Sequence, residues 1–448
     1  MKGSRSRTPA ARLCFATLLS LSSLLALTGR AAAEKILLKS DGWEVFTDGR
    51  VGGFFSQVNG EGFPVPTFTV TNPDGSTTMD TVQGGGWSAE TSNAAGSNQG
   101  TVNMSRIRSG FLGNQFNFGV RGQVTPDTTV TGYISIWAFI ESISRQKNSA
   151  NPADVRQGYA KLEGPWGSFL AGRTRTLFSR GATDIDVLYA HKWGVGFPST
   201  IDNTGPTAGQ VGFGVLGSGF AAGLIYGTPV LGGFHLNIGA FDPAVLSGSG
   251  QTRSEYPRAE AEATFEQTFG QTGKVVVFVN GAYQETYKDG ACDPTTNVGP
   301  CQTTLAGVGY GGRFELGFFH LGLAGHYGQG LGMGYALENS PAAFDNQGNP
   351  RKFDGYYAQT QFVLRRFDLF AGVGETRAFL TSLDKAATPA GSSPNSVIKY
   401  QRGYNAGVVF NMTPFVHFDL EYFRAEAAWW LGEHQVLNTA DFGMTFNW

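Results

Sequence analysis

Short segments that alternate apolar and polar side chains recur along almost the whole chain, joined by connections of two different lengths. In the segment 105–124, Phe116, Phe118 and Val120 alternate with polar residues or glycine. A period of two is typical of a β-strand with one apolar face. We count sixteen such segments after residue 41, and turns of about three to six residues alternate with loops of roughly ten to forty-five residues. The chain is therefore predicted to be an all-β protein.

A transmembrane barrel explains this rhythm better than a soluble sandwich does. Bacterial barrels have an even number of strands, short turns at one end and long loops at the other, and only alternate residues face lipid. This agrees with a chain in which 15% of residues are charged and which has no long apolar run after residue 33. The predicted fold is a transmembrane antiparallel β-barrel of sixteen strands over residues 34–448. A soluble surface β-protein or adhesin is the alternative.

The last residues show the alternation most clearly. Phe442, Met444 and Phe446 share one face, with small or polar residues between them. Because a sheet edge cannot stay unpaired in lipid, the last strand must pair with the first. We expect these three side chains to face lipid and Trp448 to lie in the aromatic belt at the membrane interface.

The first 33 residues have the pattern of a secretory signal peptide. Basic residues precede an apolar stretch over 13–27, and Ala31–Ala33 offers a cleavage site with small residues. An uncleaved membrane anchor is the alternative. Removal of residues 1–33 would leave 28 Lys and Arg against 35 Asp and Glu, a formal charge of −7. A chain this acidic is not expected to bind nucleic acid.

Two cysteines remain after residue 33. Cys292 and Cys301 lie nine positions apart in a polar segment, and the oxidising setting of an exported protein favours a disulfide between them. A metal site is the weaker alternative, because two cysteines without a nearby histidine do not complete a ligand set. We predict neither a metal nor another cofactor.

Catalytic motifs are weak. The stretch GFGVLG (212–217) fits a dinucleotide-binding pattern by letter, but no strand–turn–helix unit surrounds it, and 64 glycines make chance matches expected. No HExxH motif occurs. We therefore predict that the chain is not an enzyme.

The chain resembles the Gram-negative trimeric porin family. The resemblance is closest in VRQGYAKLEGPWGSFLAGRTRTLF (155–178), which is similar to a family strand–turn–strand with lumenal arginines leading into the third long loop. SRIRSGFLG (105–113) is similar to the start of the family's second strand. The aromatic end looks like the family's assembly signal, although Trp448 stands where Phe is commoner. The third loop lacks the family's compact acidic motif.

The resemblance implies an outer-membrane homotrimer through which small hydrophilic solutes and ions diffuse. It implies a third loop that folds into each pore, opposes acids to a basic wall and so sorts solutes. It also implies that the barrel-assembly machinery reads the last strand, and that outer-membrane lipids surround the barrel.

The resemblance also suggests which charged residues line the pore. The wall candidates are Arg106, Arg108, Arg121, Arg156, Arg173 and Arg175, and the loop candidates are Asp184, Asp186 and Asp202. A charge that faces lipid is costly, so arginines in mid-strand should point inward. Arginines that are merely solvated at the rim, and aspartates of an ordinary polar loop, are the alternatives.

A substrate-selective porin with a weak saturable site, for sugars or organic anions, is the alternative function. Tyr133, Trp137 and Phe139 share a face and could line a sugar track. Packing at the rim is the other explanation for these aromatic residues. The acidic total favours cations and the arginine cluster favours anions, so the sequence leaves the ion preference open.

Overall fold

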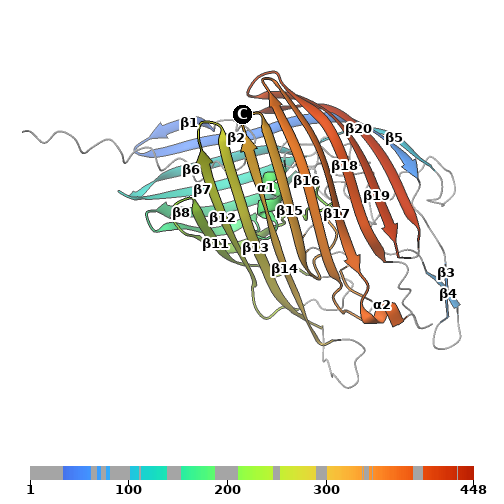
Figure 1. The fold of residues 1–448 in the computed structure, drawn as a ribbon. Coiled ribbons are helices and arrows are strands. Elements are labelled where there is room, and N and C mark those ends of the chain that lie inside the picture. The colour runs from blue at the N-terminus through green and yellow to red at the C-terminus, as the bar shows by residue number, and fades with distance from the viewer. Residues whose placement is uncertain are drawn as a thin grey trace, which may run out of the picture.

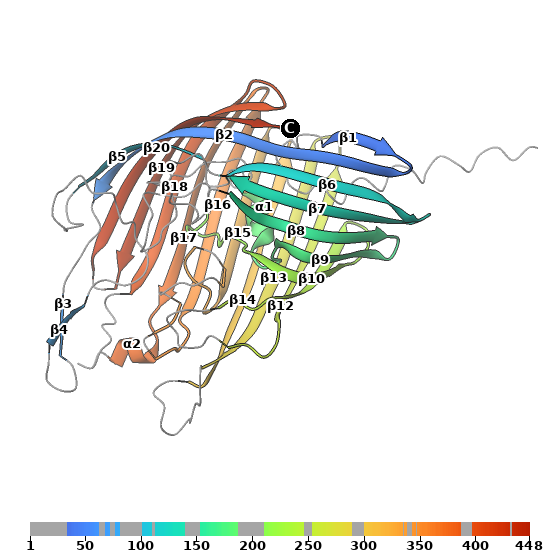
Figure 2. The same ribbon diagram turned by 180° about the vertical axis from the view of Figure 1, so that it is seen from behind.

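The computed structural model describes residues 34–61, 68–71, 77–80, 101–109, 113–138, 153–186, 210–245, 253–288, 300–334, 336–337, 343–345, 347–386, 397–430 and 432–448. Most of these residues belong to one antiparallel sheet that curves round on itself (Figure 1). Figure 2 shows the same sheet from behind, with the shorter strands β6 to β10 in front.

Within the described residues the sheet has 18 strands. They are β1 (Lys35–Ser40), β2 (Trp43–Glu61), β5 (Thr101–Arg108), β6 (Asn114–Thr125), β7 (Thr128–Ala138), β8 (Ala153–Gly164), β9 (Gly167–Arg175), β10 (Phe220–Gly227), β11 (Phe234–Phe241), β12 (Arg258–Phe269), β13 (Gly273–Tyr287), β14 (Gln302–Leu316), β15 (Phe319–Gln329), β16 (Lys352–Leu364), β17 (Phe367–Phe379), β18 (Ile398–Asn411), β19 (Val416–Trp429) and β20 (His434–Asn447). β3 (Phe68–Thr71) and β4 (Thr77–Asp80) form a separate hairpin. The helices are α1 (Arg180–Ile185) and α2 (Ser382–Ala386).

The 18 strands form a closed barrel with 16 strand positions around its wall, as predicted. β5 and β6 pair with successive parts of β2 and so together occupy one strand position. β1 and β20 pair with the same edge of β2: β1 with its start and β20 with its remaining length. β1 and β20 therefore also share one strand position. Subtracting one strand for each of these two shared positions from 18 leaves 16. The pairing of β2 with β20 closes the ring, which removes every open edge from the wall.

The connections follow the predicted short and long rhythm. The short connections range in length from residues 126–127, between β6 and β7, the shortest kind, to residues 228–233, between β10 and β11, the longest of them. The longest connection, residues 176–219, joins β9 to β10. The last connection differs from the prediction: β19 and β20 are longer than expected, so that only residues 430–433 join them.

The outer face of the barrel is apolar, as the alternation predicted. On β20, Phe442, Met444 and Phe446 are exposed, whereas Asp441 and Thr445 are buried. The same alternation on β6 exposes Phe116 and other apolar side chains. Exposed apolar residues over most strands make a band suited to contact with acyl chains.

Aromatic rings gather on this face close to the short turns. Trp448 stacks on Phe446, with centroids 5.7 Å apart, and its ring also lies 5.2 Å from Phe116. Further pairs near the turns are Phe269–Phe314, Phe319–Phe362, Phe367–Phe410 and Phe410–Phe418. Rings at this level form the expected interfacial belt, with Trp448 in it.

Ion pairs replace apolar side chains toward the long-loop end of the outer face. Arg377 of β17 binds Asp354 of β16 at 2.6 Å, and Arg424 binds Glu426 within β19 at 2.8 Å. Paired charges belong in the hydrated headgroup region rather than in hydrocarbon. They therefore mark the upper limit of the apolar band.

Candidate functional site

The inner face of the barrel carries the polar half of each alternation. On β12, Arg258, Glu260 and Glu262 are all buried on one face. The alanines that alternate with them face outward, in register with outward residues of β11 and β13. A lumen lined in this way is polar over much of its surface.

We name the long connection between β9 and β10, residues 176–219, L3; its described parts lie against the inner face of the barrel. Its described parts are residues 176–186, which include α1, and residues 210–219. α1 lies against β13, β14 and β15, although it follows directly after β9. The hydroxyl of Tyr357, on β16, donates to the carbonyl oxygen of Ala182 at 3.3 Å. These contacts place the loop across the interior, against the wall beyond β12, and Figure 1 shows α1 enclosed by the strands.

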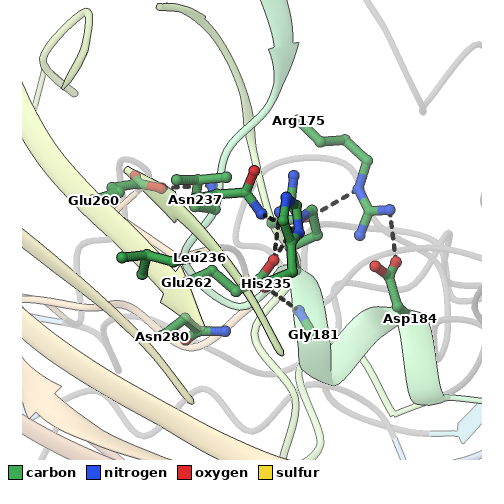
Figure 3. A network of polar contacts seen from close by, with 12 residues as sticks. Arg175, Gly181, Asp184, His235, Leu236, Asn237, Glu260, Glu262 and Asn280 are labelled. Carbon is green, nitrogen blue, oxygen red and sulfur yellow. Dashed lines mark hydrogen bonds and ion pairs between the residues drawn. The ribbon is translucent and has the colours of Figure 1, made fainter. Parts of the chain in front are cut away.

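Two glutamates of β12 on the inner wall bind the first part of L3. Glu260 Oε2 accepts hydrogen bonds from the backbone N–H groups of Leu177 and Phe178, both at 2.7 Å. Glu262 Oε2 accepts from the Gly181 N–H at 3.0 Å, and its other oxygen pairs with the Arg180 guanidinium (Figure 3). The first N–H groups of a helix have no partner within the helix, so Glu262 satisfies a donor that α1 itself leaves free, whereas Glu260 binds the segment just before α1.

A close approach at Gly181 fixes the depth at which α1 sits. A Cβ atom at this position would collide with the Phe278 ring, which points inward from β13. Asn280, two residues further along the same strand, accepts a hydrogen bond from the Ser179 N–H through Oδ1 at 3.3 Å. The start of L3 is thus held by both polar contacts and close packing.

The second described part of L3 is held further round the barrel. Gln210 donates through Nε2 to Asn405 Oδ1 on β18 at 3.0 Å. The Gly214 N–H donates to Thr376 Oγ1 on β17 at 2.8 Å. Gly214 has φ +98°, and a Cβ atom there would collide with the Tyr356 carbonyl oxygen, so only glycine fits this close approach. L3 is therefore fixed to the wall from β12 to β18.

The predicted loop aspartates serve mainly as anchors. Asp184 binds the Arg175 guanidinium at 2.7 Å, as Figure 3 shows. Asp186 is only 2% exposed and accepts hydrogen bonds from the Gln210 N–H at 2.8 Å and from Gln359 Nε2 at 3.2 Å. Asp202 lies outside the described residues. Asp184 and Asp186 therefore bind partners within L3 and on the wall.

The predicted wall arginines lie in several different places. Arg121 is on the inner face but near the short turns, where it pairs with Glu34 at 2.6 Å and with Glu44 at 2.9 Å. Arg156 lies over the Trp137 ring, 5.4 Å from its centroid, and pairs with Asp154 at 2.8 Å. The structure does not bring these two guanidinium groups together.

Arg175 and Arg173 have different surroundings. Arg175 ends β9, and its guanidinium binds Asp184 of α1. Arg173 is exposed and lies on the strand face of Phe169, which is also exposed, in register with Ala222 of β10. This is the outer face, because Leu170, on the opposite face, packs with buried Phe241. Arg173 is therefore corrected from a wall residue to an outer-face residue.

Arg106 and Arg108 can be placed by backbone register alone. They pair with Ser56 and Phe54 of β2, whose side chains are buried on the inner face. The expectation that these two arginines line the pore stays a prediction.

An aromatic row lies on the inner wall below L3. The Tyr133 ring stacks on Tyr159 at 5.3 Å and on Phe46 at 6.3 Å, and its hydroxyl lies 3.4 Å from the Asp48 carboxylate. Trp137 is 7% exposed, and Phe139 lies outside the described residues. Tyr133 thus lies on the inner wall, where the sequence suggested a track.

Other predictions fall where the structure does not test them. Residues 1–33 and Cys292 lie outside the described residues, so the signal peptide and the Cys292–Cys301 disulfide stay predictions. In the described part of the chain no helix is long and apolar enough to cross a membrane. The described residues also hold no group of three or more potential metal ligands.

The anchors of L3 were missed in the sequence. Glu260 and Glu262 stand in RAEAEATFEQT (258–268), which predicts a strand and shows the alternation of acid and alanine plainly. The pattern shows that the acids share a face, but not that a distant loop would dock there. Asn280 and Thr376 carry no local signal at all.

Comparison with known proteins agrees with the barrel and its lumen. The sequence profile of the Gram-negative porin family matches residues 20–427. No curated protein matches the chain significantly.

Similar solved structures are outer-membrane proteins. The outer-membrane channel DcaP of Acinetobacter baumannii aligns with a TM-score of 0.61 and 15% identity, covering 92% of this chain and 99% of that one. The anion-selective porin of Comamonas acidovorans aligns with a TM-score of 0.56 and 11% identity, covering 91% and 100%. A loop-deletion mutant of Vibrio cholerae OmpT aligns with a TM-score of 0.50 and 13% identity, covering 91% and 100%. At these identities the likeness concerns the fold.

The profile covers nearly the whole chain, and the barrel closes with the 16 strand positions that the alternation predicted. The chain therefore belongs to the Gram-negative porin family and forms a channel barrel of the outer membrane.

Proposed function

We propose that this porin lets small hydrophilic solutes and ions diffuse passively through a water-filled barrel that L3 narrows. The attachment of L3 carries the proposal: L3 donates hydrogen bonds to Glu260 and Glu262 in its first described part and to Asn405 and Thr376 in its second, and these bonds hold both parts against the inner wall. Parts of L3 that are held in this way have a defined position and therefore support a defined opening. Uniform tethering of this kind favours a stable open pore over a mobile gate.

The chemistry of the inner face suits hydrophilic cargo. Carboxylates, amides and guanidinium groups order water along the wall, and a polar solute can exchange hydrogen bonds with that water as it passes. An apolar solute must displace the water without replacing its hydrogen bonds, which is costly. The barrel therefore favours small polar molecules and ions without needing a tight binding site.

A substrate-selective porin with a weak saturable site remains the second candidate. The stacked rings of Phe46, Tyr133 and Tyr159, with the Asp48 carboxylate beside them, favour it. Aromatic faces with a hydrogen-bond acceptor nearby suit the apolar and hydroxyl faces of a sugar. A polar solute that slowed at this row would give saturable transport.

Assembly follows from family membership. We infer a homotrimer embedded in outer-membrane lipids, inserted by the barrel-assembly machinery through its recognition of β20. The apolar outer face and the aromatic end of β20 support the lipid contact and the recognition signal. A trimer should resist SDS at room temperature and dissociate on boiling.

Single-channel recording in a planar bilayer, under a salt gradient, tests the proposal. We expect stepwise openings in groups of three, and the sign of the reversal potential gives the ion preference. Folded protein that conducts no current would overturn the proposal of an open pore. Addition of a sugar or an organic anion separates the two candidates, because only a saturable site gives current block that levels off with concentration.

A further inference from the structure

A second long loop packs into the lumen beside L3. We name it L6: it joins β15 to β16 over residues 330–351, of which 330–334, 336–337, 343–345 and 347–351 are described. The Gly217 N–H of L3 donates to the Gly334 carbonyl oxygen at 2.8 Å, and the Ala336 N–H donates back to the Gly217 carbonyl oxygen at 3.0 Å. The two loops thus exchange backbone hydrogen bonds in the manner of paired strands.

An apolar core joins these loops to the wall. Phe178 of L3 and Leu331 of L6 are both 0% exposed, and they meet above Gly307 of β14. A Cβ atom at Gly307 would lie 2.7 Å from Phe178 Cζ and 2.8 Å from Leu331 Cδ2. The same cluster includes Phe213, Leu216, Met333, Ala336, Leu337, Phe344, Phe353, Phe423, Trp429 and Leu437. A polar lumen that contains such a cluster is unexpected unless the two loops form one packed unit.

L6 is braced from its other side by the connection between β17 and β18, which begins at residue 380 and contains α2. Arg351, at the end of L6, binds the Asp384 carboxylate of α2 through Nε at 2.8 Å and through Nη2 at 2.9 Å. The Thr381 hydroxyl donates to Asp345 Oδ2 at 2.8 Å. The base of L6 is closed by a hydrogen bond from the Gly330 N–H to the Arg351 carbonyl oxygen at 2.9 Å. L6 therefore lies wedged between a fixed support and L3.

We propose that L6 is the positioning element of the pore loop and that Leu331 is its principal positioning residue. L6 holds L3 against the wall from β12 to β18 through the packing of Leu331 beside Phe178 and through the Gly217 hydrogen bonds. The size of the opening then depends on a loop other than the one that narrows it. This inference rests on the proposed channel function and adds to it the residue that holds the constriction in place.

The variant Leu331→Ala tests the proposal, and Leu323→Ala is its matched control. Leu323 is the same residue type on the adjoining strand β15, but it is 49% exposed on the outer face. We expect Leu331→Ala to raise single-channel conductance, to increase open-channel noise severalfold, and to admit larger polyethylene glycols. Leu323→Ala should match the parent in all three measurements. The shift in gel mobility on boiling should show that both variants fold.

A second variant protects the test if Leu331→Ala does not fold. Gly307→Ala adds a methyl group on the wall beneath the Phe178 and Leu331 side chains, and displacing them should also raise noise and conductance. Equal conductance, noise and polymer cut-off in the parent and in a folded variant at either position would overturn the role of L6. A parent protein without any conductance would instead overturn the proposed function, so the two failures are distinguishable.

Discussion

The backbones of Gly49 and Trp448 exchange two hydrogen bonds, each 3.0 Å long, at the point where the barrel closes. The Trp448 ring lies over Gly49, so that a Cβ atom there would collide with the ring and with the Gln115 carbonyl oxygen. Closure of the sheet and placement of the Trp448 ring in the aromatic belt therefore depend on glycine at position 49.

We expect Gly49→Val to reduce the yield of folded barrel strongly, because the new side chain meets backbone as well as a ring. Overpacking of this kind costs about 1–3 kcal/mol where neighbours can move, and backbone moves least. The measurement is the fraction of refolded protein that shifts mobility on boiling. Gly132→Val is the control, since a Cβ atom at Gly132 meets nothing within 4 Å. Equal folded fractions for the two variants would contradict this account of closure.

We expect the Glu260 carboxylate to keep the open-channel noise low. Glu260→Ala leaves the buried N–H groups of Leu177 and Phe178 without their acceptor, at a cost of about 1–3 kcal/mol for each unsatisfied group. We expect the start of L3 to loosen, with greater open-channel noise in a bilayer. Glu266→Ala, six positions along the same face of β12, is the control because Glu266 pairs with Lys274 instead of L3. If noise rises equally in both variants, the anchor is not specific.

The strands of this barrel were accessible from sequence because lipid and lumen impose opposite chemistry on alternate residues. Segments such as 234–241 and 319–328 were predicted to within one residue at each end. The face of β9 was not accessible: Phe169 and Leu170 are both apolar and Gly172 has no side chain, so the alternation loses its phase. That loss of phase is the reason why Arg173 was assigned to the wall although it lies outside.

The loops were less predictable because their contacts are distant in sequence. Asp186 and Gln359 are far apart in the chain, and no local pattern indicates that one would accept a hydrogen bond from the other. The sequence identified Asp184 and Asp186 as loop acids in the lumen but could not distinguish acids that face a solute from acids that hold the loop. Burial decides between these roles, and burial depends on how L3 folds against the wall.

Asp186 provides a direct test of that distinction. Asp186→Asn keeps the size of a buried side chain but removes the negative charge that accepts hydrogen bonds from Gln210 and Gln359. We expect noisier openings with little change in the reversal potential, since a charge buried in the loop attachment is not at the surface where ions pass. Reversal potentials measured under a salt gradient check this expectation. A large shift toward anion preference, without added noise, would show instead that Asp186 faces the pore.

The Arg351–Asp384 pair should make the brace of L6 sensitive to acid. Burial alone would raise the pKa of the Asp384 carboxyl, but the Arg351 guanidinium and the donors of Thr381 outweigh burial and hold that pKa below its ordinary value. A carboxyl with a lowered pKa stabilises the fold above the ordinary value near 3.8, and this stabilisation is lost as the pH falls through the lowered pKa. We therefore expect the brace to be intact at neutral pH and to fail in strong acid.

Hydrogen–deuterium exchange of peptides from residues 343–351 and 381–386 measures this loss. Asp384→Asn should exchange faster than the parent at pH 7, and the difference in protection should disappear only as the pH falls through the lowered pKa of Asp384, where the parent carboxyl becomes protonated as well. Asp127→Asn is the control, since Asp127 lies in the turn between β6 and β7, at the opposite end of the barrel. Protection that differs by the same factor at pH 7 and in strong acid would show that the charge of Asp384 does not hold the brace.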